Sequence, residues 1–378
     1  MTRVLVNLLW LVPGVVGGSE ESTTDALRAV ADALDAQDAS ARIDLHLAVL
    51  LPFADAHPDL AARFPLHVLD QDGRDKRRRV LSEQTWLPAT TRAIGAEVVH
   101  HAGGVLPLRH PARSVLTVHD LQPLDMPANF RMSKRIYIRS MAGRSVRGAD
   151  VLTAPSDFTR DRLVAVLGAS PERIEVVPWW VGPHTAPVAE PFPLPPGLGD
   201  DPYFLYPAIT YPHKQHVVLL EAFALLARSH PEVRLVLTGG AASAEADVQA
   251  RMRRADLDGR VLRTGRVPSE QLESLFAAAT AVAVPSCYEG FGLPVLEAMV
   301  RGVPVIAAAA GSLPEVARSA DLVAADDVDA WAAALGAVLS ESPADRAQRI
   351  AAGHARAARF TPERTATGLL RAYRRARS

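Results

Sequence analysis

Residues 285–299 read PSCYEGFGLPVLEAM, and the interpretation of the whole chain starts from this stretch. The apolar residues 281–285 predict a buried strand, and residues 293–301 predict a helix with apolar side chains at helical spacing. In the turn between them, Gly290 and Gly292 let the backbone approach a ligand closely, and Pro294 suits a first helical turn. A helix N-terminus presents free N–H groups and the positive end of a dipole, which bind phosphate oxygens.

Two glutamates accompany this turn. Glu289 lies at the mouth of the loop, and Glu297 lies one turn into the predicted helix. Carboxylates accept hydrogen bonds from hydroxyl groups, so phosphate-binding N–H groups with carboxylates on either side suit a sugar nucleotide. A strand, a glycine turn and a helix occur in every doubly wound protein, and a glutamate near a helix start can simply complement the dipole. Each glutamate alone therefore leaves a structural role open.

The full string resembles the E-x7-E signature of the retaining glycosyltransferases of family GT4, since Glu289 and Glu297 have that spacing. The resemblance implies an α/β chain with the GT-B fold, two Rossmann-like doubly wound parallel-sheet domains facing a central cleft. It also implies that the first glutamate contacts the hexose of a nucleotide-sugar donor and the second its ribose. The turn residues implied to bind the donor are Gly290, Phe291, Gly292 and Leu293.

Length and composition argue against several other classes of protein. The 378 residues are enough for two domains, and the net charge of −1 does not indicate nucleic-acid binding. One cysteine, Cys287, rules out an internal disulfide framework, fits a reducing compartment and is given no chemistry. The apolar run 4–16 is interrupted by Pro13 and Gly14, so a strand and loop are expected there rather than a signal peptide. We therefore expect a soluble, cytoplasmic protein.

Strands alternate with helices along the chain, which predicts parallel sheets whose ligands gather at the carboxyl ends of the strands. We expect an N-terminal acceptor-side domain at residues 1–182, a Pro/Gly-rich linker at 183–201 and a donor domain at 202–360. A last helix at 361–378 is expected to pack back on the first domain. The predicted strands are residues 4–11, 44–51, 66–69, 98–101, 114–119 and 151–154, then 203–207, 234–237, 261–262, 281–285 and 303–308.

Three places in the first domain are candidates for ligand contact. Gly17 and Gly18 follow the first strand, where a simple turn is an equal alternative. His119 stands at the end of a central strand and resembles the family's histidine beside the donor sugar, with Asp120 as its expected orienting partner. Ser156 is a natural helix cap, and its surroundings also resemble the family's Ser-x-Phe-(Ser/Thr) element near the cleft.

In the second domain, residues 209–216 read ITYPHKQH before an apolar helix. A lysine at a helix start faces an unfavourable dipole, so a bound diphosphate would explain Lys214 better than stability does. The resemblance assigns Lys214 and His213 to the donor phosphates. Thr210 in the same stretch is an accessory candidate. His213 departs from the arginine of many members, and a histidine is charged only part of the time near neutral pH. Val267 lies in a segment that resembles the border of the nucleotide base.

No metal site or other cofactor is expected. The pairs Asp256/Asp258 and Asp327/Asp329 have the Asp-x-Asp form of a divalent-metal site, but neither follows an apolar strand near the expected nucleotide. Acids at a helix start stabilise the dipole, so we interpret both pairs as structural.

The predicted reaction is a metal-independent, retaining transfer of a hexose to a hydroxyl acceptor, with His119, Lys214 and Glu289 as the catalytic residues. GDP-mannose is slightly favoured over a UDP-hexose. A nucleotide-sugar 2-epimerase of the same fold and a non-catalytic sugar-nucleotide-binding subunit are the alternatives. The basic segments 74–79 and 131–147 predict a solvated helix face, and peripheral membrane contact is the lesser alternative.

Overall fold

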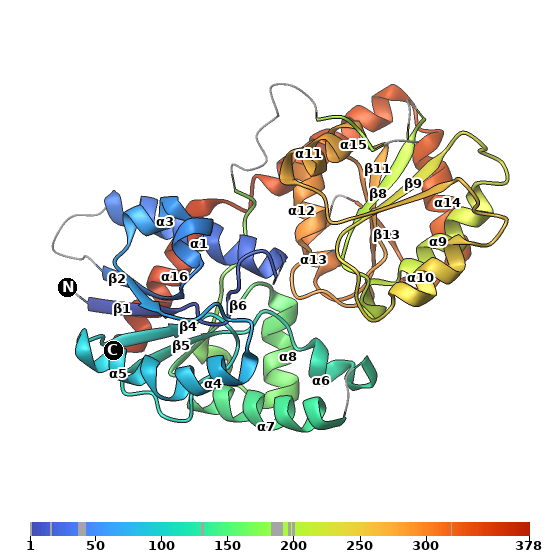
Figure 1. Cartoon of the computed structure of the whole chain (residues 1–378). Coiled ribbons are helices and arrows are strands. Elements are labelled where there is room, and N and C mark those ends of the chain that lie inside the picture. Colours follow the sequence, from blue (N-terminus) through green and yellow to red (C-terminus); the bar gives the residue numbers. More distant parts are fainter. Residues whose placement is uncertain are drawn as a thin grey trace. The chain divides into compact units, whose positions relative to one another are not determined.

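The computed structural model describes residues 2–15, 17–36, 43–129, 132–182, 192–195, 198, 201–318 and 320–378. The chain forms two compact units, which are coloured along the sequence in Figure 1. Unit 1 comprises Met1–Trp180 and Phe360–Ser378, and unit 2 comprises Val181–Arg359. The predicted linker at residues 183–201 lies largely outside the described residues.

Unit 1 is built on a parallel sheet with the strand order β3-β2-β1-β4-β5-β6-β7. The first strand ends at Asn7, earlier than predicted, because the backbone turns at Leu8 and Leu11 N donates to Leu8 O. The short strand β7 was not predicted, since three residues carry too little periodicity. The strands are β1 Thr2–Asn7, β2 Ile43–Leu50, β3 Leu66–Leu69, β4 Val98–His101, β5 Arg113–Thr117, β6 Val151–Ala154 and β7 Ile174–Val176.

Helices cover both faces of this sheet (Figure 1). Val4 and Val6 of β1 pack in one core with α1 and α16, whereas Leu5 packs in a second core with Leu87 of α5. The last helix of the chain therefore completes the core of unit 1. The helices are α1 Gly18–Asp35, α2 Phe53–Ala56, α3 Pro58–Arg63, α4 Lys76–Gln84, α5 Trp86–Ala93, α6 Gln122–Asp125, α7 Met132–Gly148, α8 Asp157–Leu167 and α16 Pro362–Arg377.

Unit 2 is a second parallel sheet with the strand order β10-β9-β8-β11-β12-β13. Its strands are apolar because helices bury them on both faces; all of Ala281–Val284 is buried. The strands are β8 Tyr203–Pro207, β9 Arg234–Thr238, β10 Val261–Gly265, β11 Ala281–Val284, β12 Val305–Ala308 and β13 Asp321–Val323, the last of which was not predicted. The helices are α9 His216–Leu226, α10 Glu245–Met252, α11 Ser269–Ala278, α12 Leu293–Val300, α13 Leu313–Val316, α14 Val328–Leu339 and α15 Pro343–Ala357.

The strand order of each sheet reverses at one point. In unit 1 the chain winds outward from β1 and then returns to place β4 against β1; in unit 2, β11 returns to pair with β8. Loops that leave neighbouring strands on either side of such a switch point form the usual ligand crevice of doubly wound sheets. We therefore expect ligand sites at the loops after β1 and β4 in unit 1 and after β8 and β11 in unit 2.

Candidate functional site

The glycine turn after β11 has the predicted form. Helix α12 begins at Leu293, with Gly292 as its N-cap at φ +102°. The backbone angle favours glycine, and a Cβ at Gly292 would lie 2.7 Å from Leu313 Cδ2 and so would displace that side chain. Phe291 in the turn is buried, with 1% of its surface exposed.

Lys214 and Glu289 come together at the switch point of unit 2. Lys214 Nζ lies 2.6 Å from Glu289 Oε1, with the two side chains only 17% and 11% exposed. The two loops are joined again where Cys287 N donates to His213 O. Tyr206 on β8 donates its hydroxyl to Lys214 O and is also bonded to Ser286. The site therefore holds a partly buried ion pair beside a helix N-terminus.

The position of Lys214 corrects one expectation. Pro212–Lys214 forms a short 3₁₀ turn, Gln215 follows in the left-handed region at φ +55°, and α9 starts only at His216. Lys214 is thus not in the first turn of α9, and Glu289 compensates its charge in this structure.

His213 carries no positive charge at neutral pH. Burial, with a further contribution from the charge of Lys214, lowers the pKa of His213 to about 4. Its ring stacks on Tyr211 with centroids 5.7 Å apart. A cationic role for His213 in the unliganded protein is therefore wrong, and Lys214 alone supplies positive charge to the 211–215 loop.

The turn after β12 packs closely against the backbone of Glu289 and forms hydrogen bonds with it. Gly311 has φ +60°, and a Cβ there would lie 2.8 Å from Glu289 N and 2.9 Å from Glu289 O. Ser312, which is fully buried, donates to Glu289 O from both its N–H (3.2 Å) and its hydroxyl (3.0 Å). The sequence did not single out Gly311 or Ser312 as site residues; a Gly-Ser pair after a predicted strand was the available signal.

Glu297 is half-buried on α12, one turn beyond Leu293. Gly290 is buried in the turn, and Leu293 is half-buried at the first position of the helix. These residues lie where the sequence placed them relative to Glu289.

Thr210 forms hydrogen bonds inside unit 2. It is fully buried; its hydroxyl donates to Glu245 (2.8 Å) and accepts from Ala242 N (2.8 Å), so it joins two loops instead of lining a surface. Arg263 from β10 donates to Gly239 O (2.7 Å) and to Glu245 (3.1 Å). Although burial opposes it, hydrogen bonds from Gln249, Arg263 and Thr210 lower the pKa of Glu245 to about 2.

This network joins the loops after β8 and β9 to strand β10 by hydrogen bonds. It was not predicted, because its members lie far apart in the sequence. Val267 is half-buried in the loop just beyond β10, so the network supports the segment that contains it.

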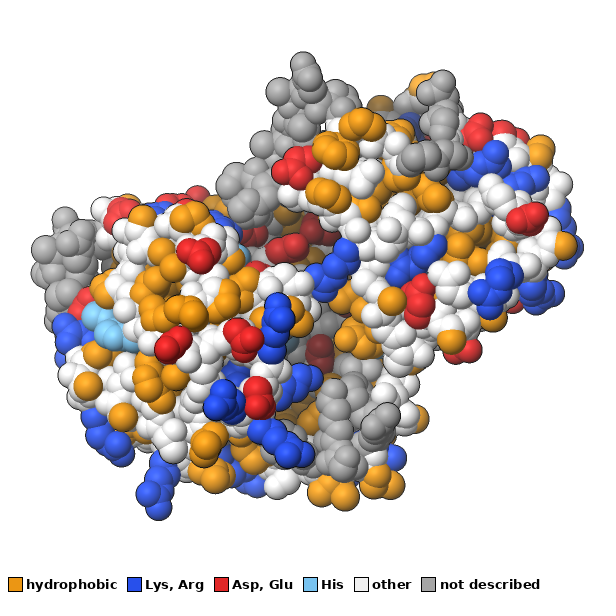
Figure 2. All heavy atoms as spheres, viewed as in Figure 1, with side chains coloured by type: hydrophobic (Ala, Val, Ile, Leu, Met, Phe, Trp, Pro, Cys, Tyr) orange, Lys and Arg blue, Asp and Glu red, His pale blue; other side chains and the backbone are white. Residues whose placement is uncertain are grey.

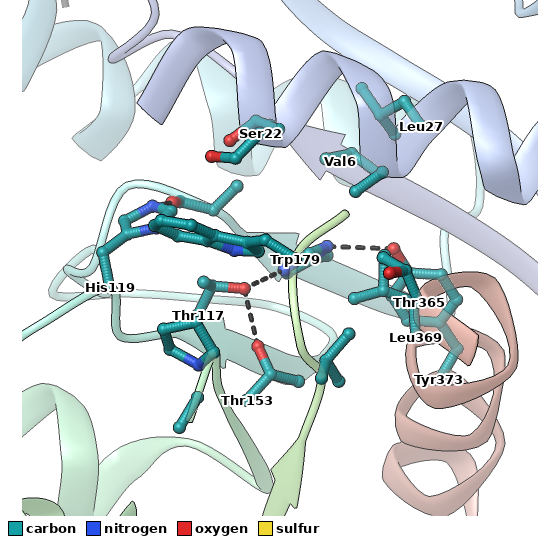
Figure 3. Close-up of a pocket in the computed structure, with 17 residues that line it drawn as sticks. Val6, Ser22, Leu27, Thr117, His119, Thr153, Trp179, Thr365, Leu369 and Tyr373 are labelled. Atoms are coloured by element: carbon teal, nitrogen blue, oxygen red, sulfur yellow. Dashed lines mark hydrogen bonds between the residues drawn. The ribbon is translucent and has the colours of Figure 1, made fainter. Parts of the chain in front are cut away.

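Unit 1 has a pocket at the carboxyl ends of its central strands, under α1 and α16 (Figure 3). Among its lining residues are polar side chains from five elements. They are Ser22 and Thr23 of α1, His100 of β4, Thr117 of β5, Thr153 of β6, and Thr365 and Tyr373 of α16, with His119 and Trp179 from loops.

His119 lies in this pocket with one ring nitrogen already bonded. Its Nε2 lies 2.7 Å from Ala102 O, and because a carbonyl only accepts, Nε2 carries the proton. Nδ1 is buried without a hydrogen-bond partner. Burial lowers the pKa of His119, so the neutral ring presents a lone pair that suits a ligand hydroxyl. The aromatic rings of Trp10 and Trp179 flank it at 5.7 and 5.5 Å.

Asp120 does not orient His119 by a hydrogen bond. The Ala102 carbonyl holds Nε2, and Asp120 instead accepts a hydrogen bond from Gln122 N within its own turn. A short side chain two residues before a helix start commonly caps the backbone in this way. The expected pairing of His119 with Asp120 is therefore wrong.

A chain of hydrogen bonds runs beneath the pocket (Figure 3). Tyr373 is bonded to His100 Nδ1 (2.9 Å), His100 Nε2 to Thr117 (2.7 Å), and Thr117 to Thr153 (2.6 Å). Burial lowers the pKa of His100 to about 3, so the ring stays neutral. The sequence did not single out these residues, since His100 lies inside an apolar strand and Tyr373 is distant in the chain.

The glycine pair opens helix α1. Gly17 is the N-cap at φ +67°, and Gly18 is the first helical residue. Glu20 holds the preceding loop, since its carboxylate accepts from Gly14 N (2.8 Å) and contacts His57 Nε2 (3.1 Å). Ser156 is fully buried and caps α8 by accepting from Thr159 N, as the sequence predicted.

Comparison with known proteins agrees with this geometry. The family model "Glycosyl transferases group 1" matches residues 195–356, and "Glycosyltransferase Family 4" matches residues 29–184. The chain is also 32% identical over 271 residues to O-antigen chain mannosyltransferase B of Escherichia coli, covering 69% of this chain and 70% of that protein. The chain belongs to glycosyltransferase family 4.

Other relatives of this family 4 glycosyltransferase are consistent with that assignment. D-inositol 3-phosphate glycosyltransferase of Segniliparus rotundus is 34% identical over 252 residues, 62% of this chain, and the chain spans about half (54%) of that protein. The crystal structure of Anabaena HepE in complex with UDP and glucose superposes with a TM-score of 0.72 at 18% identity, covering 98% of both chains. The predicted GT-B fold is thereby confirmed, and the protein is an enzyme.

In this glycosyltransferase the two Asp-x-Asp pairs have structural partners. Asp327 caps α14 by accepting from Ala330 N, and Asp256 pairs with Arg251 at 2.9 Å. Within the described ranges, no group of three or more His, Cys, Asp or Glu side chains could hold a metal ion. The described helices also include none long and apolar enough to cross a membrane.

Proposed function

We propose that this glycosyltransferase moves a hexose from a nucleoside diphosphate sugar to a hydroxyl acceptor, with retention at the anomeric carbon and without a metal ion. The observation that carries the proposal is the Lys214–Glu289 pair beside the N-terminus of α12. A lysine and free helical N–H groups bind phosphate oxygens, and a carboxylate binds sugar hydroxyls. A reducing compartment such as the cytoplasm suits a chain whose sequence contains a single cysteine.

The ion pair gives the two residues linked roles. When the diphosphate arrives, Lys214 turns to the phosphate, and Glu289 is released to accept a hydrogen bond from a hexose hydroxyl. As the nucleoside diphosphate leaves, Lys214 and the backbone N–H groups of the turn stabilise the charge that develops on the phosphate. Glu289 acts as a positioning residue, and the leaving phosphate oxygen takes the proton of the acceptor, which attacks the same face of the sugar.

The remaining residues bind parts of the two substrates. Glu297 accepts hydrogen bonds from the ribose, and Val267 borders the base. In unit 1 the Nδ1 lone pair of His119 accepts a hydrogen bond from a sugar hydroxyl, and the Gly17–Gly18 loop faces the donor phosphates or the acceptor. Since burial keeps His119 neutral, it acts as an acceptor of hydrogen bonds and not as a cation.

GDP-mannose is our first candidate for the donor. The name of the E. coli relative, a mannosyltransferase, supports a mannosyl donor, whereas the UDP and glucose in the HepE title keep a UDP-hexose as the competing choice. The acceptor is a hydroxyl of a glycan, a lipid-linked sugar or a small glycoside.

Ligand-induced stabilisation tests donor class and site together. The full chain is heated with GDP, UDP, ADP and their hexose conjugates, in EDTA and in Mg²⁺, as wild type, Lys214→Ala and Lys76→Ala. A ligand at a hundred times its Kd stabilises by about 2.7 kcal/mol. We expect one nucleotide to stabilise the wild type equally in EDTA and Mg²⁺, Lys214→Ala to lose the shift, and the exposed-lysine control Lys76→Ala to keep it.

Product analysis then tests the reaction. The preferred donor is incubated with and without a panel of hydroxyl acceptors, and the products are analysed by mass spectrometry and NMR. A glycoside with the anomeric configuration of the donor supports the proposal. A 2-epimeric sugar formed without an acceptor would identify an epimerase, and a shift seen only with Mg²⁺ would contradict metal independence.

A further inference from the structure

Unit 1 carries a surface in which basic and apolar side chains alternate. We call it the α4–α7 face and define it by six exposed residues. They are Arg77, Arg78 and Leu81 of α4, Leu108 of the loop between β4 and β5, and Ile136 and Arg139 of α7. Figure 2 shows basic and apolar side chains interspersed over this part of unit 1.

The two helices and the loop form one surface. Leu108 N donates to Gln84 Oε1 at the end of α4 (2.7 Å). Arg144 of α7 donates to Leu106 O (3.1 Å) and Pro107 O (2.8 Å). The loop that contains residues 106–108 is therefore hydrogen-bonded to both helices. The exposed side chains therefore act together, although they are far apart in the sequence.

The apolar side chains of this face project into solvent. Leu81 and Leu108 are each 62% exposed and Ile136 is 65% exposed. Single exposed apolar residues need no explanation, but three large ones on one fastened surface are typical of an interaction site.

The charge of the face is uncompensated. Within the part of the chain that the structure describes, Arg77, Arg78 and Arg139 form no ion pair, whereas about half of the other arginines of unit 1 do. Asp75, the N-cap that precedes α4, accepts hydrogen bonds from the backbone N–H groups of Arg77 and Arg78 and forms no ion pair with their side chains. The chain as a whole has a net charge of −1, so this positive surface is a local feature.

We infer that the α4–α7 face docks on an anionic lipid surface. Arginines are attracted to anionic headgroups, and aliphatic side chains enter the boundary between headgroups and acyl chains. Nucleic acid fits less well, since single-stranded sites use aromatic stacking and the apolar members here are aliphatic. Docking would hold unit 1 at a bilayer without any membrane-spanning helix. The inference does not depend on the proposed transfer reaction.

Vesicle sedimentation with the full chain tests this inference. The probes are vesicles of phosphatidylcholine alone and vesicles that also contain phosphatidylglycerol, at low and high salt. The variants are Arg77→Glu with Arg78→Glu, and Leu81→Ser with Ile136→Ser. The matched control is Arg228→Glu with Arg253→Glu, which reverses two exposed arginines of unit 2.

We expect the wild type and the control to sediment with the anionic vesicles at low salt. The arginine variant should lose at least about 30-fold in partition coefficient, since each basic residue near such a surface contributes about fivefold. The serine variant should lose about tenfold or more from the lost apolar burial. All variants should keep the wild-type melting temperature, which shows that they are folded.

Three results would overturn the inference: a wild type that stays in solution with anionic vesicles, equal binding by wild type and both face variants, or tighter, arginine-dependent binding to a DNA or RNA oligonucleotide than to vesicles. Because vesicle binding is measured without a nucleotide sugar, its failure would leave the proposed transferase function standing.

Discussion

Replacing Glu289 by glutamine separates the negative charge of this side chain from its hydrogen bond to Lys214 at the switch point of unit 2. The substituted side chain keeps an oxygen that accepts a hydrogen bond from Lys214 but removes the negative charge. The perturbation therefore acts on the electrostatic part of a contact that measures 2.6 Å in the free protein.

The magnitude follows from distance and burial. At an effective dielectric constant of about 20, two charges at this distance attract by about 6 kcal/mol, and desolvation offsets most of it. Removing one partner of a fully buried pair costs about 3–5 kcal/mol, and an exposed pair contributes about 0–1 kcal/mol. With side chains 17% and 11% exposed, we expect Glu289→Gln to lower the free energy of unfolding by about 2 kcal/mol.

The effects on ligands should diverge. In the free protein Glu289 competes with phosphate for Lys214, so Glu289→Gln should bind the nucleoside diphosphate at least as tightly as the wild type. Lys214→Ala should weaken that binding about 10- to 100-fold, because a charge-assisted hydrogen bond is lost. Turnover of the hexose donor should fall roughly 100-fold in Glu289→Gln, since the hydroxyl contact is weakened.

Urea denaturation measures the free energy of unfolding, and calorimetric titration measures the affinity for the nucleoside diphosphate. An assay of donor turnover measures the loss of activity. Lys76→Ala serves as the control lysine, with an expected change within about 0.5 kcal/mol. The reasoning is refuted if Glu289→Gln weakens the nucleoside diphosphate as much as Lys214→Ala does, because Glu289 would then not compete with phosphate.

Three further predictions concern residues that hold the loops and the pocket in place: Gly311, Glu245 and Tyr373. Gly311→Ala should lower both stability, by about 2–3 kcal/mol, and donor turnover, because its Cβ would meet the Glu289 backbone; Gly259→Ala, with φ +66° and open space, should cost only about 1 kcal/mol. Glu245 has a folded pKa of about 2 against 4.5 in the unfolded chain, so it stabilises the fold above about pH 4.5 and progressively less as the pH falls toward 2. Urea denaturation should therefore show a larger cost of Glu245→Gln at pH 7 than at pH 3, and equal costs would contradict the assigned hydrogen bonds. Tyr373→Phe removes the hydroxyl bonded to the buried histidine of β4 and should destabilise unit 1 by about 1–2 kcal/mol, whereas no change would mean that the hydrogen bond is weak.

Much of the architecture could be predicted because its signals are local. Apolar runs of strand length and helical spacing of apolar residues mark the buried faces of each element, so β3, β4, β6 and β8 have the predicted bounds. The strands β7 and β13 were missed since each has only three residues and contains polar side chains. The glycine turn before α12 was found because its residues are consecutive.

The sequence singled out candidate residues for the site but not the contacts between them. Lys214 and Glu289 are 75 residues apart, and nothing in either segment shows that the two side chains pair. The hydrogen-bond partners of Asp120 and Thr210 were missed for a similar reason. A short polar side chain can bond to its own turn or to a ligand, and only the positions of Gln122 N and Glu245 decide between these.

The sequence by itself determined which segments are buried, where the chain turns with glycine, and which charged residues stand at strand ends, because these properties depend on neighbouring residues. Only the tertiary structure decided the partners: Glu289 for Lys214, the Ala102 carbonyl for His119, and the Gly311 turn for the backbone of Glu289. These pairings arise from the order of strands in two sheets, which brings together loops distant along the chain.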